Sequence, residues 1–155
     1  MRRQRVTEWI RDAVAELGLP PTEAVLLPER DAVALVDTIG RQFVDHPTRT
    51  WWWEGLREPQ ASHHAADGRG CEIAAEVVPP ECRRIFLIGS DDDPPPWPVF
   101  DVSRSVLAKL LSECPAFEYL LTGADHSWLV GENHHNVVFA VGRDVVERLN
   151  AYASN

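Results

Sequence analysis

Three short apolar runs follow one another near the C-terminus, and only short polar segments separate them. The runs are residues 117–121, 128–132 and 137–141, and each has the length of a β-strand. Strands joined by such short connections pair in antiparallel fashion, because a parallel crossover needs a dozen or more residues. The sequence therefore predicts an antiparallel meander in this part of the chain.

Apolar residues at helical spacing lie on both sides of the strand-rich region. Helices are predicted for residues 6–17, 30–43, about 104–113 and 143–152. Further strands are predicted for residues 48–56, 84–89 and 99–102, loops for residues 58–70 and 91–98, and either a strand or a short helix for residues 71–78. We therefore expect an α+β fold, a mostly antiparallel sheet of five to six strands with helices packed on it.

The chain contains neither an internal repeat nor a recognisable linker. Its 155 residues are 45% hydrophobic, which is enough to build one core. We expect a single domain, residues 1–155, with a helical part (1–46), a sheet with one inserted helix (48–142) and a C-terminal helix (143–153).

The charge balance restricts the classes of partner. Asp and Glu number 24 against 15 Lys and Arg, which gives a net charge of −9. Nucleic acid and anionic membranes attract positively charged surfaces, so we expect neither, and we expect a basic protein as the partner. An odd number of cysteines without a C-x-x-C pair fits a reducing compartment, and no run approaches the ~20 apolar residues of a membrane span. The sequence thus predicts a cytoplasmic protein.

Glu132, Asn133, His134 and His135 lie together directly before the last apolar run. We interpret the segment NHHN as the turn of a hairpin, with both histidines at its centre and a positive φ there. This turn would pair Glu132 with Val137, Val130 with Phe139 and Trp128 with Val141.

In that hairpin Glu132 shares a covered face with Trp128 and Val130. A buried carboxylate is costly unless it is paired, so we expect an arginine, a histidine or backbone donors beside it. The alternative to a structural role is a small acid–base or metal-dependent hydrolase with Glu132, His134, His135 and His126 as candidate catalytic residues.

The pattern argues against a metal site and against known catalytic motifs. Zinc needs three or four converging ligands, whereas neighbouring strand residues point to opposite faces. No spacing brings His63, His64, Asp125 or His126 to the histidine pair. The chain also lacks a nucleophile elbow, a Walker A loop and a dinucleotide fingerprint. We therefore predict no metal or cofactor and favour a protein that is not an enzyme.

Aromatic and acidic side chains are the candidates for a binding surface. Trp51 and Trp53 would share one face of a strand and Trp52 the other, and an exposed tryptophan is a strong interface anchor. The candidate binding residues are Asp91, Asp92, Asp93, Trp97, Trp51 and Trp53. Oligomerisation through the aromatic strand, for example as a homodimer, is a further possibility.

Residues 117–142 carry the pattern W-L-x-x-E-N-H-H followed by a short apolar strand and glycine. The matching positions are Trp128, Leu129, Glu132, Asn133, His134, His135 and Gly142. This pattern resembles a group of small bacterial domains of unknown function, and residues 84–102 resemble that group's strand, acidic loop and strand, so the likeness covers about half of the chain. Size, charge and composition are also similar to those of immunity proteins of bacterial polymorphic toxin systems. That similarity implies a protein that binds and blocks a cognate toxin, and it transfers no catalytic residue.

Overall fold

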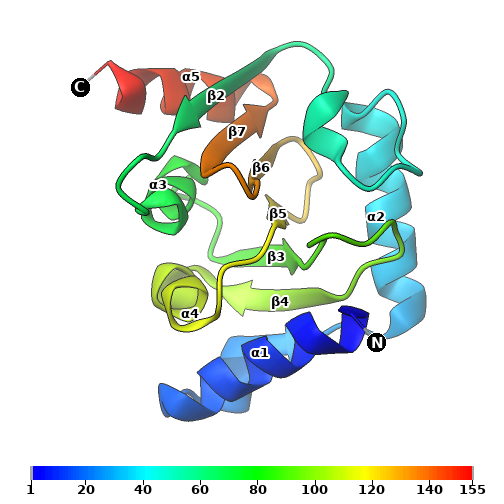
Figure 1. The fold of residues 1–155 in the computed structure, drawn as a ribbon, viewed down its shortest axis with the longest axis vertical. Helices are drawn as coiled ribbons and strands as arrows, with labels where there is room; N and C mark the ends of the chain where they lie inside the picture. The colour runs from blue at the N-terminus through cyan, green and yellow to red at the C-terminus, as the bar shows by residue number, and fades with distance from the viewer. Residues whose placement is uncertain (1, 155) are drawn as a thin grey trace.

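A seven-stranded antiparallel sheet forms the centre of the molecule (Figure 1). The computed structural model describes residues 2–154, with side chains from residue 5 onward, so Met1 and Asn155 of the predicted domain lie outside the described part. The sheet order is β1-β4-β3-β5-β6-β7-β2. The strands are β1 (Ala24–Leu26), β2 (Gln60–His64), β3 (Arg84–Ile88), β4 (Val99–Ser103), β5 (Tyr119–Thr122), β6 (Leu129–Glu132) and β7 (Val137–Val141).

Helices cover both faces of this sheet. The helices are α1 (Arg2–Glu16), α2 (Glu29–Phe43), α3 (Gly70–Val77), α4 (Leu107–Glu113) and α5 (Arg143–Ala153). Residues of α1, α3, α4 and α5 share one apolar cluster with one face, whereas α2 packs with the other face and with Trp52 and Trp97. In Figure 1 this places α2 on the right of the sheet and the other helices on the left and at the two ends.

The central strands are buried on both faces. In β5, Leu121 belongs to the cluster under α1, α3, α4 and α5, while its neighbour Leu120 belongs to the cluster under α2. In β6, Val130 and Leu129 divide in the same way. This two-sided burial explains why these strands read as continuous apolar runs and show no alternation.

The predicted α+β class is confirmed, and the sheet is larger than predicted because two short edge strands were missed. β1 lies inside the predicted helical segment 1–46, and β2 lies inside the predicted loop 58–70. β2 pairs with β7 over five residues, and its side chains are exposed or half-exposed. An edge strand with so little burial needs no apolar residues, so the polar sequence QASHH gave no strand signal.

The segment 71–78, which fitted either a strand or a short helix, is helical up to Val77 and forms most of α3 (Gly70–Val77). The sheet segment 48–142 therefore contains two helices, α3 and α4, and the prediction of one inserted helix was wrong. Ile73, Ala74 and Val77 of α3 are buried against the sheet, which is the stripe that an amphipathic helix needs.

The predicted aromatic strand at residues 48–56 does not exist. Trp52–Glu54 form one turn of 3₁₀ helix, and an isolated bridge between Val44 and Leu56 is the only strand-like contact nearby among the described residues. The Trp52 indole donates to the Pro47 carbonyl at 2.9 Å and packs on Gly40, where a β-carbon would lie 2.9 Å from its ring. Burying this one large ring curls the segment back onto α2.

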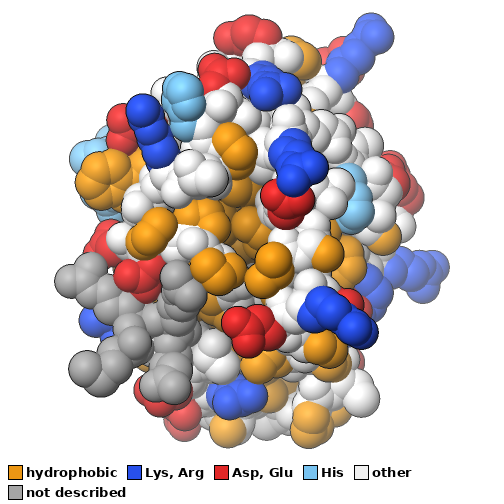
Figure 2. Space-filling view, turned by 90° about the vertical axis from the view of Figure 1, so that its right-hand side faces the viewer, with side chains coloured by type: hydrophobic (Ala, Val, Ile, Leu, Met, Phe, Trp, Pro, Cys, Tyr) orange, Lys and Arg blue, Asp and Glu red, His pale blue; other side chains and the backbone are white. Residues whose placement is uncertain are grey.

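The face of the molecule on which α2 lies is hollowed at its centre, where hydrophobic side chains are visible between charged side chains of both signs (Figure 2). Of the helices that the structure describes, none has the length and apolar character needed to cross a membrane.

We predict that Leu121→Ala lowers the free energy of unfolding by about 3 kcal/mol, because a fully buried leucine is replaced by a cavity between the sheet and its helices. Val33→Ala, at a position that is 43% exposed, is the control and should change stability by less than about 0.5 kcal/mol. Urea denaturation of both variants measures the difference. Equal losses would show that the central strands are not the core.

Candidate functional site

The two neighbouring histidines lie at the centre of the turn between β6 and β7, as predicted. The Asn136 amide donates to the Asn133 carbonyl at 3.1 Å, and the Asn133 side chain accepts hydrogen bonds from the amides of His135 (2.9 Å) and Val137 (3.2 Å). Asn133 is buried. These bonds hold His134 and His135 in one defined arrangement, with their ring centroids 4.0 Å apart.

The predicted strand register was wrong by one residue. Glu132 pairs with Val138 rather than Val137, and the shift places Phe139 on the opposite face from Val130. The positive φ of the turn is at Asn136 (59°) and at neither histidine. A turn followed by a left-handed residue contains one residue more than a two-residue hairpin loop, which displaces all following pairs.

The partner of His134 is Glu118, which the sequence analysis did not single out. Glu118 directly precedes β5 and is only 4% exposed. Its Oε1 accepts the backbone N–H of His134 at 2.9 Å and contacts Nδ1 of the same residue. The side chain of His134 remains 44% exposed. One buried carboxyl group thus fixes the imidazole from one side and leaves the rest of the ring accessible.

Glu132 lies on the same side of the sheet as Val130, as predicted, but its partner is a tyrosine. The Tyr119 hydroxyl donates to Glu132 Oε1 at 2.9 Å across the β5–β6 pair. Burial raises the pKa of Glu132 above its usual value, and the bond from Tyr119 opposes part of that rise. Burial and the neighbouring Glu132 also raise the pKa of Tyr119 well above its usual value, so its hydroxyl stays protonated.

The carboxyl group of Glu132 rests directly on Gly70, the first residue of α3. A β-carbon at position 70 would overlap Glu132 Oε2. Glycine is therefore the residue that lets the helix begin against this side chain.

A cavity of about 530 Å³, which we call the acidic cavity, opens beside these groups. Glu118, Tyr119, Glu132 and His134 line it, together with Asp91 and Asp92 of the loop before β4 and with residues of α4 and of the segment that follows it. A much smaller cavity of about 10 Å³ shares Glu118, Tyr119 and Glu132 and reaches Trp53. The indole N–H of Trp53 is buried and has no hydrogen-bond partner in the part of the chain that the structure describes.

Aromatic rings surround the outer side of the histidine turn. The ring centroid of His134 lies 6.0 Å from Trp51 and 5.8 Å from Trp53, and that of His135 lies 5.6 Å from Trp53. Trp51 is 43% exposed, and the rings of Trp51 and Trp53 are 6.4 Å apart. The predicted alternation along a strand was wrong, because the segment is not a strand; Trp51 and Trp53 still contact each other, whereas Trp52 is buried. We call Trp51, Trp53, His134 and His135 the aromatic cluster.

Three predicted residues do not join this site. Trp97 is 3% exposed; its indole donates to the Asp93 carbonyl at 2.7 Å and meets the ring of Trp52 at 5.0 Å, so it is a core residue. Asp93 does not line the acidic cavity. His126 lies at the other end of β6, in the β5–β6 connection. A catalytic group that includes both His126 and His134 is therefore not assembled.

Metal-ligating and nucleophilic groups are poorly placed for chemistry. Within the described residues, no three His, Cys, Asp or Glu side chains are arranged to hold a metal ion. Cys114 lines the cavity, but burial raises its pKa to about 11, so it is not a thiolate near neutral pH. The Cys71 thiol lies 3.3 Å from the Ser112 hydroxyl, and the three cysteines are free.

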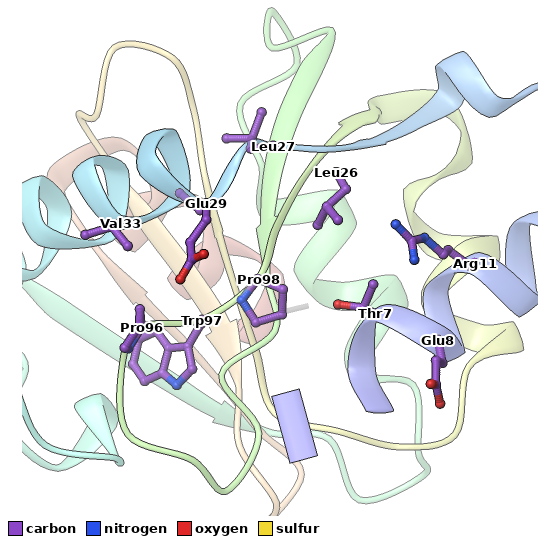
Figure 3. A pocket seen from close by; sticks show the side chains of 11 residues that line it. Thr7, Glu8, Arg11, Leu26, Leu27, Glu29, Val33, Pro96, Trp97 and Pro98 are labelled. Atoms are coloured by element: carbon purple, nitrogen blue, oxygen red, sulfur yellow. The ribbon is translucent and has the colours of Figure 1, made fainter. Parts of the chain in front are cut away.

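A second cavity, of about 430 Å³, lies between α1, β1, the start of α2 and the proline-rich loop (Figure 3). Its floor is largely apolar, with Leu26, Val33 and Pro98 among its residues, and the Arg11 side chain extends toward Leu26. Apart from Trp97, it contains none of the residues that the sequence singled out. The acidic cavity is lined by four of those residues, Asp91, Asp92, Glu132 and His134, and it adjoins three more, Trp51, Trp53 and His135, so it is the candidate site.

We predict that Glu132→Gln gains stability relative to the wild type as the pH rises. A carboxyl group whose pKa is raised by folding binds its proton more tightly in the native state, so the native state loses stability as the pH rises from the usual glutamate pKa of 4.5 through the folded value. Glutamine removes this titration and still accepts the Tyr119 bond.

Urea denaturation of the wild type and of Glu132→Gln between pH 4 and pH 8 measures the difference. The exposed residue Glu113 supplies the control, Glu113→Gln. A stability difference between Glu132→Gln and the wild type that stays constant with pH would contradict the raised pKa.

Comparison with known proteins gives one match. The model of a family described as "Family of unknown function (DUF6756)" matches residues 3–153. No curated protein matches the chain, and no solved structure does. Because the match covers almost the whole sequence, the chain belongs to this family of unknown function.

Proposed function

We propose that the protein is a binding protein that recognises a basic protein partner through the acidic cavity and the adjoining aromatic cluster. The observation that carries the proposal is the continuity of the two features at His134. This residue lines the cavity and also contacts Trp51 and Trp53. Carboxyl groups and half-exposed tryptophans thus share one surface, which is the combination expected for binding a positively charged protein.

The charge of the whole molecule supports the same partner. With a net charge of −9, the protein attracts basic molecules over a distance and orients them before contact. The four carboxyl groups that line the cavity belong to Asp91, Asp92, Glu118 and Glu132. They place part of that charge in a recess, where it is less screened by solvent than on an open surface.

An immunity protein of a bacterial toxin system is the specific form of this proposal. Such a protein has to present a preformed surface, since it binds one cognate partner tightly. The asparagine-bonded turn and the Glu118 contact provide that rigidity. The partner is then a basic toxin, and the natural candidate is a basic protein encoded by a neighbouring gene.

Binding kinetics with that neighbouring protein test the proposal. Asp92→Lys should slow association about threefold or more, and the effect should shrink at high salt, because Asp92 is exposed at the cavity. Trp51→Ala should weaken affinity about tenfold or more through faster dissociation. Asp31→Lys, on α2, is the matched control for charge and should have a smaller effect. No binding by the wild type to any basic neighbour-encoded protein would refute the proposal.

Acid–base hydrolysis is the second candidate function, and the contact between Glu118 and His134 favours it. A buried carboxyl group that holds Nδ1 of an accessible imidazole is the arrangement by which enzymes orient a general base. The pair differs from the predicted one, because the carboxyl group belongs to Glu118 and not to Glu132. In this function His134 would take a proton from water at the cavity.

Hydrolysis of p-nitrophenyl acetate tests this second function. If it is correct, the wild type should accelerate hydrolysis above buffer, and His134→Ala should lower the rate about 100-fold. His135→Ala is the control, since its ring does not contact Glu118 in the described structure, and it should retain most of the rate. Equal rates in both variants would exclude His134 as a general base.

A further inference from the structure

We propose that the acidic cavity binds the guanidinium group of one arginine side chain that the basic partner inserts. The inference rests on the proposed function and adds the chemical identity of the group that is recognised. It is carried by the buried side chain of Glu118, by the apolar residues that line the cavity together with the carboxyl groups and by an arginine of this chain that already contacts the rim.

Glu118 is the first observation, because its side chain is buried and only one of its two oxygens accepts hydrogen bonds from the described residues. The side chain is 5% exposed, and His134 engages Oε1 alone. No described residue donates a hydrogen bond to Oε2, although Glu118 lines the cavity. Oε2 is not fully buried, so a ligand that carries N–H groups can reach it from the cavity and form charge-assisted hydrogen bonds with it.

Charge across the cavity is the second observation. The described side chains that line it include four carboxyl groups and one histidine, and they include no lysine or arginine. Glu132, which also lines the cavity, has its pKa raised by burial and would gain from a cationic neighbour. The negative charge of the described lining residues is therefore not balanced within the cavity, so a positively charged group of a ligand could bind there.

The shape of the cavity matches a long side chain. Leu111, Pro115 and Phe117 form an apolar wall, and Phe117 packs against the ring of Tyr119 at 5.9 Å. A volume of about 530 Å³ exceeds what one ion fills and suits a side chain with several methylene groups. Arginine lays such a stem along apolar surface while its head reaches polar groups.

Arginine fits better than lysine or a metal ion. A guanidinium presents five N–H donors in one plane and can reach two carboxylates at once, whereas an ammonium is a compact point charge. No described group of side chains has the convergence that a metal requires. The rim already holds a guanidinium, since Arg5 contacts Asp91 at 3.4 Å and lies 5.0 Å from the ring of Trp9.

Titration with capped amino acids tests the inference without the partner. The probes are the Nα-acetyl N-methylamides of arginine, lysine and citrulline, and the last has almost the shape of arginine but no charge. Calorimetry, or amide and indole shifts in nuclear magnetic resonance spectra, should show saturable binding of the arginine probe. The lysine probe should bind several-fold more weakly, and the citrulline probe should not bind. Equal binding of the arginine and citrulline probes, or no saturable binding of arginine, would overturn the inference.

Three variants locate the binding. Glu118→Gln should weaken arginine binding about tenfold, and Glu113→Gln, which changes the net charge equally at an exposed position, should leave it unchanged. Arg5→Gln should strengthen binding, because it frees Asp91 from its ion pair. If Glu118→Gln does not fold, Asp92→Asn at the exposed side of the cavity is tested in its place. This variant should bind the arginine probe about threefold more weakly. Unchanged binding in Glu118→Gln or Asp92→Asn would place the arginine elsewhere.

Together, the arginine titration and the partner-binding kinetics distinguish a failure of the arginine site from a failure of the proposed function. A basic partner that binds the wild type and Glu118→Gln equally, but binds Asp92→Lys more slowly, would refute the arginine site and leave the binding function intact. Binding of the arginine probe, combined with no binding of the wild type to any basic neighbour-encoded protein, would support the site and refute the function.

Discussion

The two-sided burial of the central strands is the constraint on which the candidate site depends. β5 and β6 are held between two apolar clusters, so neither strand can slide or rotate without exposing large side chains. Their ends are therefore fixed points. Glu118 enters β5 at the end where Glu132 leaves β6, and the rigid sheet holds both carboxyl groups at the edge of the same cavity. Apolar contacts in the core therefore determine where the polar turn after Glu132 lies.

The chemistry of the groups around the cavity is the reason why we favour the proposed binding function over hydrolysis. Glu118 uses one oxygen to fix both the backbone and the ring of His134, which stiffens the turn. Tyr119 keeps its proton, Cys114 keeps its own because burial raises its pKa to about 11, and no described metal ligand set is present. A hydrolase would need a group that stabilises the developing negative charge. The described lining instead carries carboxyl groups, which suit a positive ligand.

The meander, the helices and the turn at His134 were predictable, because each leaves a strong local pattern of apolar spacing or turn residues. The register was not, since it depends on whether Asn136 adopts a left-handed conformation. The strand β2 and the curled segment at Trp52 were missed for a related reason, as both are decided by contacts with distant residues. Glu118 is recognisable in the sequence as a carboxylate between Phe117 and Tyr119 in an apolar run. The sequence pattern around Glu132, which precedes two histidines, is more conspicuous, and it led to the wrong carboxylate as the partner of His134.

The contact between Gly70 and Glu132 links two distant positions in the evolution of this family. A chain that acquires a side chain at position 70 must move or shorten the one at position 132, because the two cannot occupy the same space. Either change alone is harmful or leaves an empty space, so the two are expected to change together. Members that keep the glycine should then be those that keep the carboxyl group, and this correlation would divide the family into forms with and without the fourth carboxyl group of the pocket.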